Sequence, residues 1–102
     1  MIDRQGSNKI ERAILVGVIH GKLDNLIIDE HLDEMGLLAN TAGAEVVGHV
    51  TQRLNKINPA YFVGKGKAEQ IMQQAKELQV SVVIFDEDLS PAQTKNFQSL
   101  SD

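Results

Sequence analysis

The sequence predicts an α/β protein with a mostly parallel sheet of three to four strands and helices on both faces. Apolar runs rich in β-branched residues alternate along the chain with stretches in which apolar residues recur every three or four positions. The first pattern is typical of strands buried on both faces, and the second of helices with one buried face. Alternation of the two implies crossover connections between parallel strands.

Length and composition fit a single domain. The chain has 102 residues, of which 42% are hydrophobic and 24% charged, and none of them is cysteine. Disulfides and cysteine zinc sites are therefore excluded. The chain begins without the apolar core of a secretion signal, and no apolar run approaches the ~18 residues that cross a bilayer. We therefore expect a cytoplasmic protein with no membrane span.

The formal net charge of −4 limits how this protein can bind nucleic acid. A basic nucleic-acid-binding domain owes its affinity to a summed positive field, which this composition lacks. A local basic patch on an acidic body is the only nucleic-acid-binding surface that the sequence permits.

Four segments are predicted to be extended. Ala13–Ile19 is continuously apolar, and Val80–Phe85 is a second predicted strand. Ala44–Thr51 alternates partly between apolar and polar residues, which places it nearer an edge of the sheet. Tyr61–Val63 is a shorter extended segment, and the sequence leaves open whether it joins the main sheet.

The first predicted helix follows a connector at residues 22–28. Asp29 or Asp33 can cap its start, and Gly43 can take the left-handed conformation at its end. Gly36 in its interior costs about 1 kcal/mol relative to alanine. Apolar residues recur on one face of this helix at Leu32, Met35, Leu38 or Ala39, and Ala42.

Two further helices are predicted in the second half of the chain. One has the clearest apolar stripe in the sequence, and the other begins at Ser90. Serine can cap a helix, Pro91 suits the first helical position, and Gln93 stands where a capping box requires it. The stripe of the former helix consists of Ala68, Ile71, Met72, Ala75 and Leu78.

These elements define an α/β domain over residues 11–102. Residues 1–10 lack periodicity and are predicted to form a flexible N-terminal arm. The order of elements ends on a helix that would normally lead into another strand. We therefore expect the sheet to be truncated before a further strand.

The stretch Gly-Lys-Gly-Lys at residues 64–67 is the most conspicuous candidate site, because it stands directly before a predicted helix. A phosphate-binding loop has the pattern G-x-x-x-x-G-K-[ST]. Counted from the end of this stretch, its first glycine would be Tyr61 and its magnesium-binding hydroxyl residue would be Ala68, so both requirements fail. The dinucleotide-binding pattern G-x-G-x-x-G also fails, because Glu69 takes the place of the third glycine.

Two interpretations of this stretch remain open. A helix start with free backbone N–H groups and two lysines is a generic anion site, here formed by Gly64, Lys65, Gly66 and Lys67. Alternatively, the stretch is a turn whose glycines supply positive φ and whose lysines are solvated.

Asp86-Glu87-Asp88 ends the last predicted strand, as acids do in the magnesium-binding strand of many ATPases. Such a carboxylate needs a phosphate loop opposite it, so a role near the positive end of the following helix is the simpler interpretation. An ATP-binding or ATPase domain that uses the Gly64–Lys67 turn and Asp86 is the alternative function.

Other catalytic and metal-binding patterns are absent. The stretch Asn55-Lys56-Ile57-Asn58 ends in asparagine instead of the aspartate that reads guanine in GTPases. The three histidines share no metal-ligand spacing. We therefore expect neither a metal site nor a catalytic residue in this chain.

Three stretches, taken together, resemble the N-terminal domain of the HflX family. They are Ala-Glu-Val-Val-Gly at 44–48, Pro-Ala-Tyr-Phe-Val-Gly-Lys-Gly-Lys at 59–67, and Val-Val-Ile-Phe-Asp-Glu-Asp-Leu-Ser-Pro-Ala-Gln at 82–93. Their spacing and order match, and the resemblance extends over nearly the whole chain, from residue 10 to residue 102.

This resemblance implies the N-terminal ribosome-binding and regulatory domain of a GTPase that associates with the large ribosomal subunit. Ribosomal RNA and the protein's own C-terminal GTPase domain are the implied partners. GTP and Mg²⁺ are implied for that GTPase domain, whereas no cofactor and no GTP hydrolysis are expected in this fragment. Lys65 and Lys67 would then contact RNA phosphates as point charges, which fix position but do not read sequence.

Overall fold

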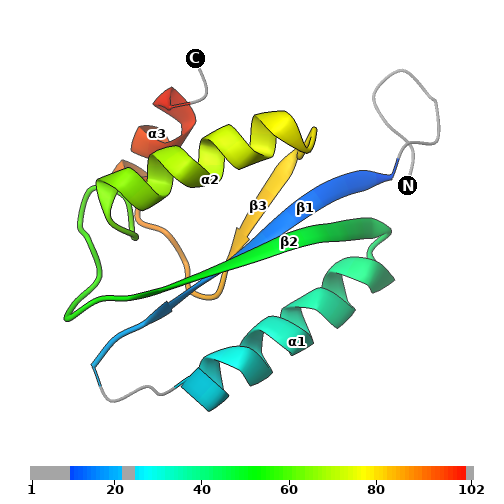
Figure 1. Ribbon diagram of the computed structural model, residues 1–102, viewed down its shortest axis with the longest axis horizontal. Coiled ribbons are helices and arrows are strands. Elements are labelled where there is room, and N and C mark those ends of the chain that lie inside the picture. The colour runs from blue at the N-terminus through cyan, green and yellow to red at the C-terminus, as the bar shows by residue number, and fades with distance from the viewer. Residues whose placement is uncertain (1–9, 22–24, 101–102) are drawn as a thin grey trace.

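A computed structural model describes residues 10–21 and 25–100. Its sheet has three parallel strands in the order β2-β1-β3. They are β1 (Glu11–Ile19), β2 (Ala44–Arg53) and β3 (Val82–Phe85). The predicted parallel α/β architecture is confirmed, and β2 lies at an edge of the sheet as its partial alternation indicates (Figure 1).

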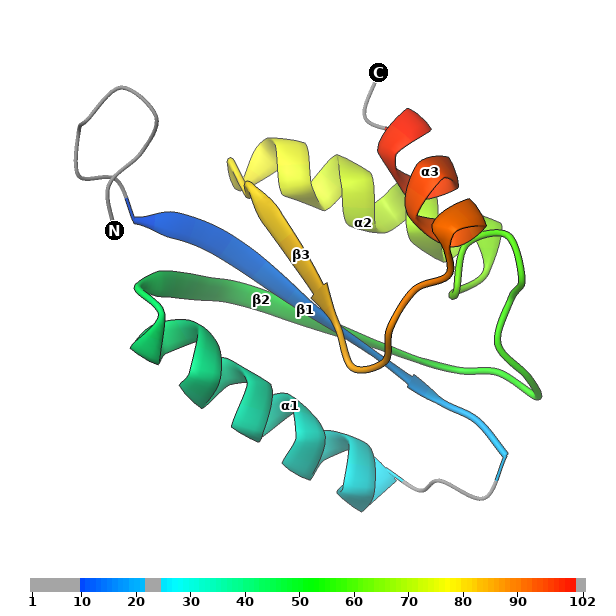
Figure 2. The same ribbon diagram turned by 180° about the vertical axis from the view of Figure 1, so that it is seen from behind.

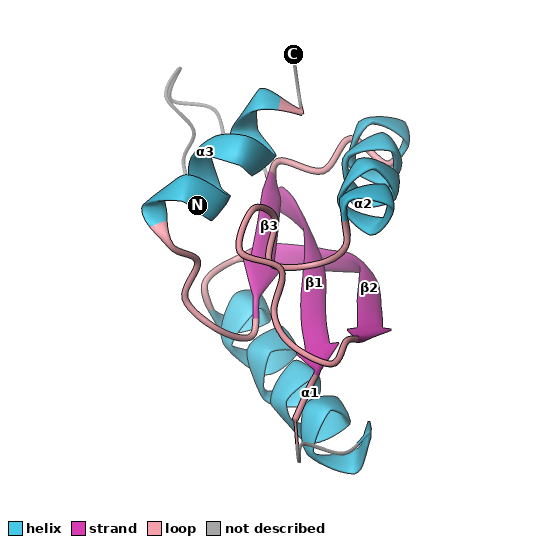
Figure 3. Cartoon of the chain, turned by 90° about the vertical axis from the view of Figure 1, so that its left-hand side faces the viewer, coloured by secondary structure: helices cyan, strands magenta, loops and turns pink. Residues whose placement is uncertain are grey.

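Three helices cover the two faces of this sheet. They are α1 (Asn25–Thr41), α2 (Lys65–Glu77) and α3 (Pro91–Ser99). Helix α1 lies on one face, and α2 and α3 lie together on the other (Figure 2). Seen along the sheet, the domain has three layers, with the strands between α1 and the other two helices (Figure 3).

The central strand β1 supplies the core of both layers. Its residues from Ala13 to Ile19 are all buried. Successive side chains of a strand point to opposite faces, so Ile14, Val16 and Val18 pack toward α2 and α3, whereas Leu15 and Ile19 pack toward α1. A continuous apolar run is therefore what a central strand between two helical layers requires.

Helix α1 begins earlier than predicted. It starts at Asn25 instead of at an aspartate cap, because Ile28 is fully buried against β1 and must belong to the helix. A Cβ on Gly17 would lie 3.0 Å from Ile28 Cγ2, so glycine at this point of β1 permits the close approach of α1. The predicted end is confirmed, since Gly43 takes a φ of +92°. Of the connector predicted at 22–28, residues 22–24 lie outside the described residues.

The segment predicted as a short strand at Tyr61–Val63 is instead part of a compact loop. The Asn58 carboxamide accepts hydrogen bonds from the N–H groups of Ala60 and Tyr61, at 2.7 and 3.0 Å. Phe62 takes a left-handed φ of +67° and is buried against Phe85, with ring centroids 5.4 Å apart. The apolar residues of this loop thus fill the core under α2 and α3, and the loop pairs with no strand of the main sheet.

The start of α3 confirms the predicted capping box. Ser90 Oγ accepts from the Gln93 N–H at 3.1 Å, and Gln93 Oε1 accepts from the Ser90 N–H at 2.8 Å. The Gln93 side chain is also buried and donates from Nε2 to the Asn58 carbonyl at 2.8 Å. Gln93 therefore joins α3 to the loop that leads into α2.

The predicted N-terminal arm, residues 1–10, lies almost wholly outside the described residues.

We expect Gln93→Ala to lower the free energy of unfolding more than Ser90→Ala does. Loss of the serine cap alone costs about 1 kcal/mol. Loss of the glutamine also removes the bond from Gln93 Nε2 to the Asn58 carbonyl, which keeps only the Phe62 N–H as donor, and this costs about 0.5–1.5 kcal/mol in addition. Urea unfolding of both variants measures the difference, with the exposed Thr94→Ala on the same helix as control. Equal losses for the two variants would contradict the role of the bond to Asn58.

We expect Gly36→Ala to raise the free energy of unfolding by about 0.5–1 kcal/mol. A Cβ at this position would lie 3.7 Å from Leu15 Cδ1, which is an ordinary contact, and alanine is the better helix former. Thermal and urea unfolding of the variant test this expectation. A destabilised variant would show that the contact with Leu15 is tighter than the structure has it.

Candidate functional site

The amino end of α2 holds the four residues singled out by the sequence. Gly64 is the N-cap residue, with φ −61° and ψ 151°, and no side chain caps the helix. The Gly64 N–H donates to Gln52 Oε1 on β2 at 2.8 Å. A Cβ on Gly64 would lie 3.4 Å from the Gln52 amide nitrogen, so the glycine lets the helix start lie close against the strand.

The first N–H groups of α2 are left open. The first backbone bond of the helix runs from the Ala68 N–H to the Gly64 carbonyl at 2.9 Å. The N–H groups of Lys65, Gly66 and Lys67 precede it and have no acceptor within residues 10–21 and 25–100. The first turn also contains no acidic residue. Open N–H groups and the positive end of the helix dipole favour an anion at this place.

The glycines of this stretch do not supply positive φ, so that part of the alternative interpretation is wrong. Gly64 is extended and Gly66 is helical, and the left-handed residue of this loop is Phe62. A Cβ on Gly66 would meet nothing within 4 Å, so the helix start is open to solvent on that side. The absence of side chains there leaves the N–H groups accessible.

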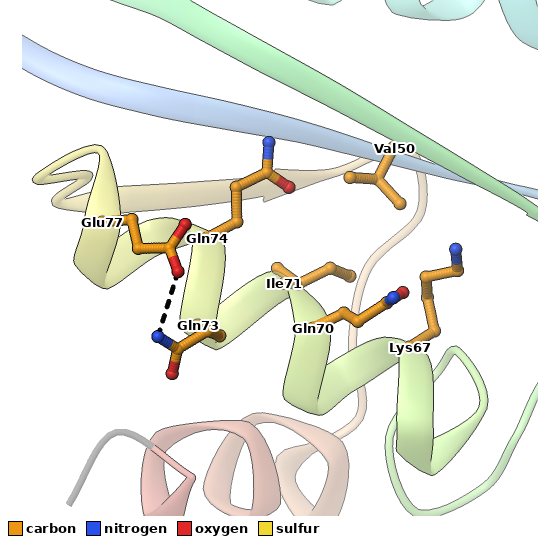
Figure 4. Close-up of a pocket in the computed structure, with 7 residues that line it drawn as sticks. All are labelled: Val50, Lys67, Gln70, Ile71, Gln73, Gln74 and Glu77. Atoms are coloured by element: carbon orange, nitrogen blue, oxygen red, sulfur yellow. Dashed lines mark hydrogen bonds between the residues drawn. The ribbon is translucent and has the colours of Figure 1, made fainter.

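A groove between α2 and β2 is lined by Lys67 and by four α2 residues that the sequence analysis did not single out. Its full lining is Val50, Lys67, Gln70, Ile71, Gln73, Gln74 and Glu77. Its volume is about 290 Å³. Figure 4 shows the side chains of Lys67 and Gln74 directed toward the sheet, where Val50 lies. At the far end of the groove Gln73 Nε2 donates to Glu77 Oε1 at 3.2 Å. The four-residue spacing of the glutamines was the only sequence signal for this polar surface.

The Asp86 carboxyl lies on the other face of the sheet. One of its oxygens lies near Gly17, on the side of β1 that α1 covers, and Oδ1 is buried without a partner among the described residues. Burial raises the pKa of Asp86 above its ordinary value, and Glu87 adds to this effect. Backbone hydrogen bonds from Val18 and Asp86 itself, together with His31, oppose the rise in pKa.

Asp86 and the Gly64–Lys67 turn therefore do not converge on one site. The neighbouring Glu87 accepts from His20 Nε2 at 2.8 Å, which joins the carboxyl ends of β1 and β3. Asp86 thus lies beside Gly17 of β1 and Glu87 pairs with His20 just after that strand, whereas the sequence placed both acids near the start of α3. Across the part of the chain that the structure describes, no three His, Asp or Glu side chains are grouped to hold a metal ion.

Comparison with known proteins identifies the family. Residues 29–102 match the family of GTP-binding GTPase N-terminal domains. The chain belongs to the HflX family. Over 102 residues it is 35% identical to GTPase HflX of Flavobacterium psychrophilum, and over 100 residues 37% identical to GTPase HflX of Escherichia coli. Over 88 residues it is 42% identical to GTPase HflX of Caldanaerobacter subterraneus.

The match covers nearly all of this chain and a small part of its relatives. It covers 100% of this chain and 24% of the length of the Flavobacterium HflX. For the Escherichia coli HflX it covers 98% of this chain and 22% of the relative, and for the Caldanaerobacter HflX 86% of this chain and 20% of the relative. The chain is therefore the N-terminal domain of an HflX-type protein. The full-length relatives are named as GTPases.

Two described stretches, residues 64–67 and 55–58, do not fit the GTP-binding motifs with which the sequence compares them. The stretch 64–67 fails the phosphate-loop pattern, and the structure builds no loop that could wrap a triphosphate there, because α2 begins at Lys65. The side-chain oxygen of Asn58, the last residue of the stretch Asn55-Lys56-Ile57-Asn58, already accepts hydrogen bonds from the N–H groups of Ala60 and Tyr61.

Among the described residues no helix is long and apolar enough to cross a membrane.

We expect Asp86→Asn to become more stable relative to the original chain as the pH rises. A carboxyl whose pKa is raised on folding stabilises the folded state below its unfolded pKa, near 3.8, and this contribution is lost as the pH rises through the folded pKa. Asparagine keeps an acceptor for the Val18 backbone and has no charge to bury. Urea unfolding of both proteins between about pH 3 and pH 7 gives the difference. A difference independent of pH would contradict the assignment.

Proposed function

We propose that this HflX domain binds the large ribosomal subunit through RNA phosphates at the amino end of α2, and that it regulates the GTPase domain of the same protein. The observation that carries the proposal is the set of open N–H groups at Lys65, Gly66 and Lys67 beside two lysine side chains. Nothing acidic stands in the first turn of this helix, although the whole chain is acidic.

Each part of this helix end suits a phosphate. The N–H groups donate in fixed directions, and the Lys65 side chain is exposed and free to follow a backbone oxygen. Lys67 is half-buried along the groove and offers a more fixed charge. Such contacts position the domain on RNA without reading bases. The neighbouring glutamines carry donors and acceptors that suit ribose hydroxyls at the same place.

The enzymatic step belongs to another part of the protein. The relatives carry the name GTPase, and this domain spans about a quarter of the length of the first of them. GTP and Mg²⁺ would bind in that part, and this domain would set its position on the ribosome. We place the protein in the cytoplasm, where ribosomes are found.

The proposal is tested by cosedimentation of the full-length protein with large ribosomal subunits across a salt series. We expect Lys65→Ala/Lys67→Ala to bind more weakly, and the slope of log affinity against log salt to fall by about 2, because each lysine neutralises one phosphate. The matched control is Lys76→Ala/Lys95→Ala, which removes the same charge from two exposed positions.

Two results would contradict the proposal. If the control weakens binding as much as the test variant, the total charge matters and the helix end does not. If neither variant changes binding, the helix end makes no phosphate contact.

Binding of ATP at the Gly64–Lys67 turn stays a prediction, although Asp86 lies on the other face of the sheet and cannot act together with this turn. Calorimetry with magnesium and ATP tests it separately.

A further inference from the structure

Helix α1 carries the net negative charge of this domain. It contains Asp29, Glu30, Asp33 and Glu34, and no lysine or arginine. The rest of the chain has ten acidic and ten basic residues, so its formal charge is zero. A helix with four acids and no cation gains nothing from its own ion pairs, and like charges at neighbouring turns repel. An electrostatic partner for this surface must come from outside the helix.

The same helix exposes most of the domain's large apolar side chains. Five large hydrophobic residues are exposed among those described, and four of them belong to α1. Leu37 and Leu38 are 69% and 65% exposed, and Leu26 is 67% exposed. Scattered exposed leucines are ordinary, but their concentration on one helix is typical of an interaction surface.

A groove of about 570 Å³ runs between α1 and the edge strand β2. Leu15, Leu32 and Val46 line it with apolar surface, and Asp29, Asp33, Leu37 and Asn40 line it from α1. The helix has no side chain at Gly36, which lies within this groove, although an alanine would fit there without a clash. The missing side chain keeps the groove open at its middle.

We propose that the groove between α1 and β2, with the exposed Leu37 at its rim, binds a basic amphipathic helix of a partner protein. A lysine or arginine of that helix would lay its aliphatic stem on Leu15 and Val46 and place its charge beside Asp29 or Asp33. The apolar face of the partner would cover Leu37, which lines the groove together with the two aspartates. A partner that carries cations and apolar side chains on one face complements both kinds of group.

The charge of the surface argues against the other occupants. RNA and an anionic membrane have the same sign of charge as α1 and are repelled by it. A symmetric pair of copies that met through α1 would bring its acids together. The proposed surface is also separate from the amino end of α2, because the two helices lie on opposite faces of the sheet (Figures 1 and 2). The domain can therefore hold RNA and a protein partner at the same time.

Fluorescence anisotropy tests this proposal with the full-length protein and a labelled helical peptide of about 18 residues made of leucine and lysine. We expect saturable binding that weakens with salt. We expect Leu37→Ser and Asp29→Asn/Asp33→Asn each to weaken it about tenfold or more, which corresponds to about 1.4 kcal/mol. All three positions are solvent-exposed, so the fold is retained, and circular dichroism checks this.

The matched control is Glu69→Gln/Asp88→Asn, which removes two exposed acids that do not belong to α1. Binding that is unchanged in the control and lost in the α1 variants supports the proposal. If the control variant weakens peptide binding as much as the α1 variants do, binding depends only on the total charge of the protein, and the proposal is wrong. No binding of the peptide, equal binding of a leucine and glutamate peptide, or self-association that the α1 variants abolish would overturn it as well.

Discussion

The burial of β1 on both faces is the constraint on which the rest of this domain depends. Every residue from Ala13 to Ile19 is removed from water, so each face of the strand needs a helical layer and each edge needs a neighbouring strand. Burying a side chain of this size stabilises the fold by about 1.5–3 kcal/mol. Gly17 is the one residue of this run without a side chain, and this allows α1 to pack closely against β1.

Polar contacts, by contrast, position the amino end of α2. Gln52 on β2 holds the Gly64 N–H, and Gln93 on α3 holds the Asn58 carbonyl on the loop between them. The amino end of α2 is thus tied to an edge strand and to a neighbouring helix through two glutamines. Because these bonds satisfy the loop without using the first N–H groups of α2, those groups stay free for a ligand.

The distribution of charge differs between the two faces of the sheet. The net charge of the chain describes neither face, because α1 is strongly acidic and the remainder is neutral overall. Repulsion between an acidic helix and RNA phosphates would favour the orientation in which α2 faces the RNA and α1 faces away. Under the proposed function, an acidic domain would in this way carry a local phosphate-binding site at Gly64–Lys67.

The sequence by itself determined the elements whose signals are local. The spacing of apolar residues predicted the α/β class and the edge position of β2. Gly43 predicted the end of α1, and Ser90 predicted the capping box of α3. These follow from backbone conformation and hydrogen bonds within a few residues. The same signals identified Gly64–Lys67 as the start of a helix without a phosphate loop.

Only the tertiary structure decided what depends on distant contacts. Phe62 was predicted to be extended, but the core beside Phe85 draws it into a left-handed turn. The acid at Asp86 was assigned to a helix end, but the strand delivers it to β1. The Gln52 anchor and the groove along α1 were invisible in the sequence, because burial and pairing across the sheet join residues that no local pattern relates.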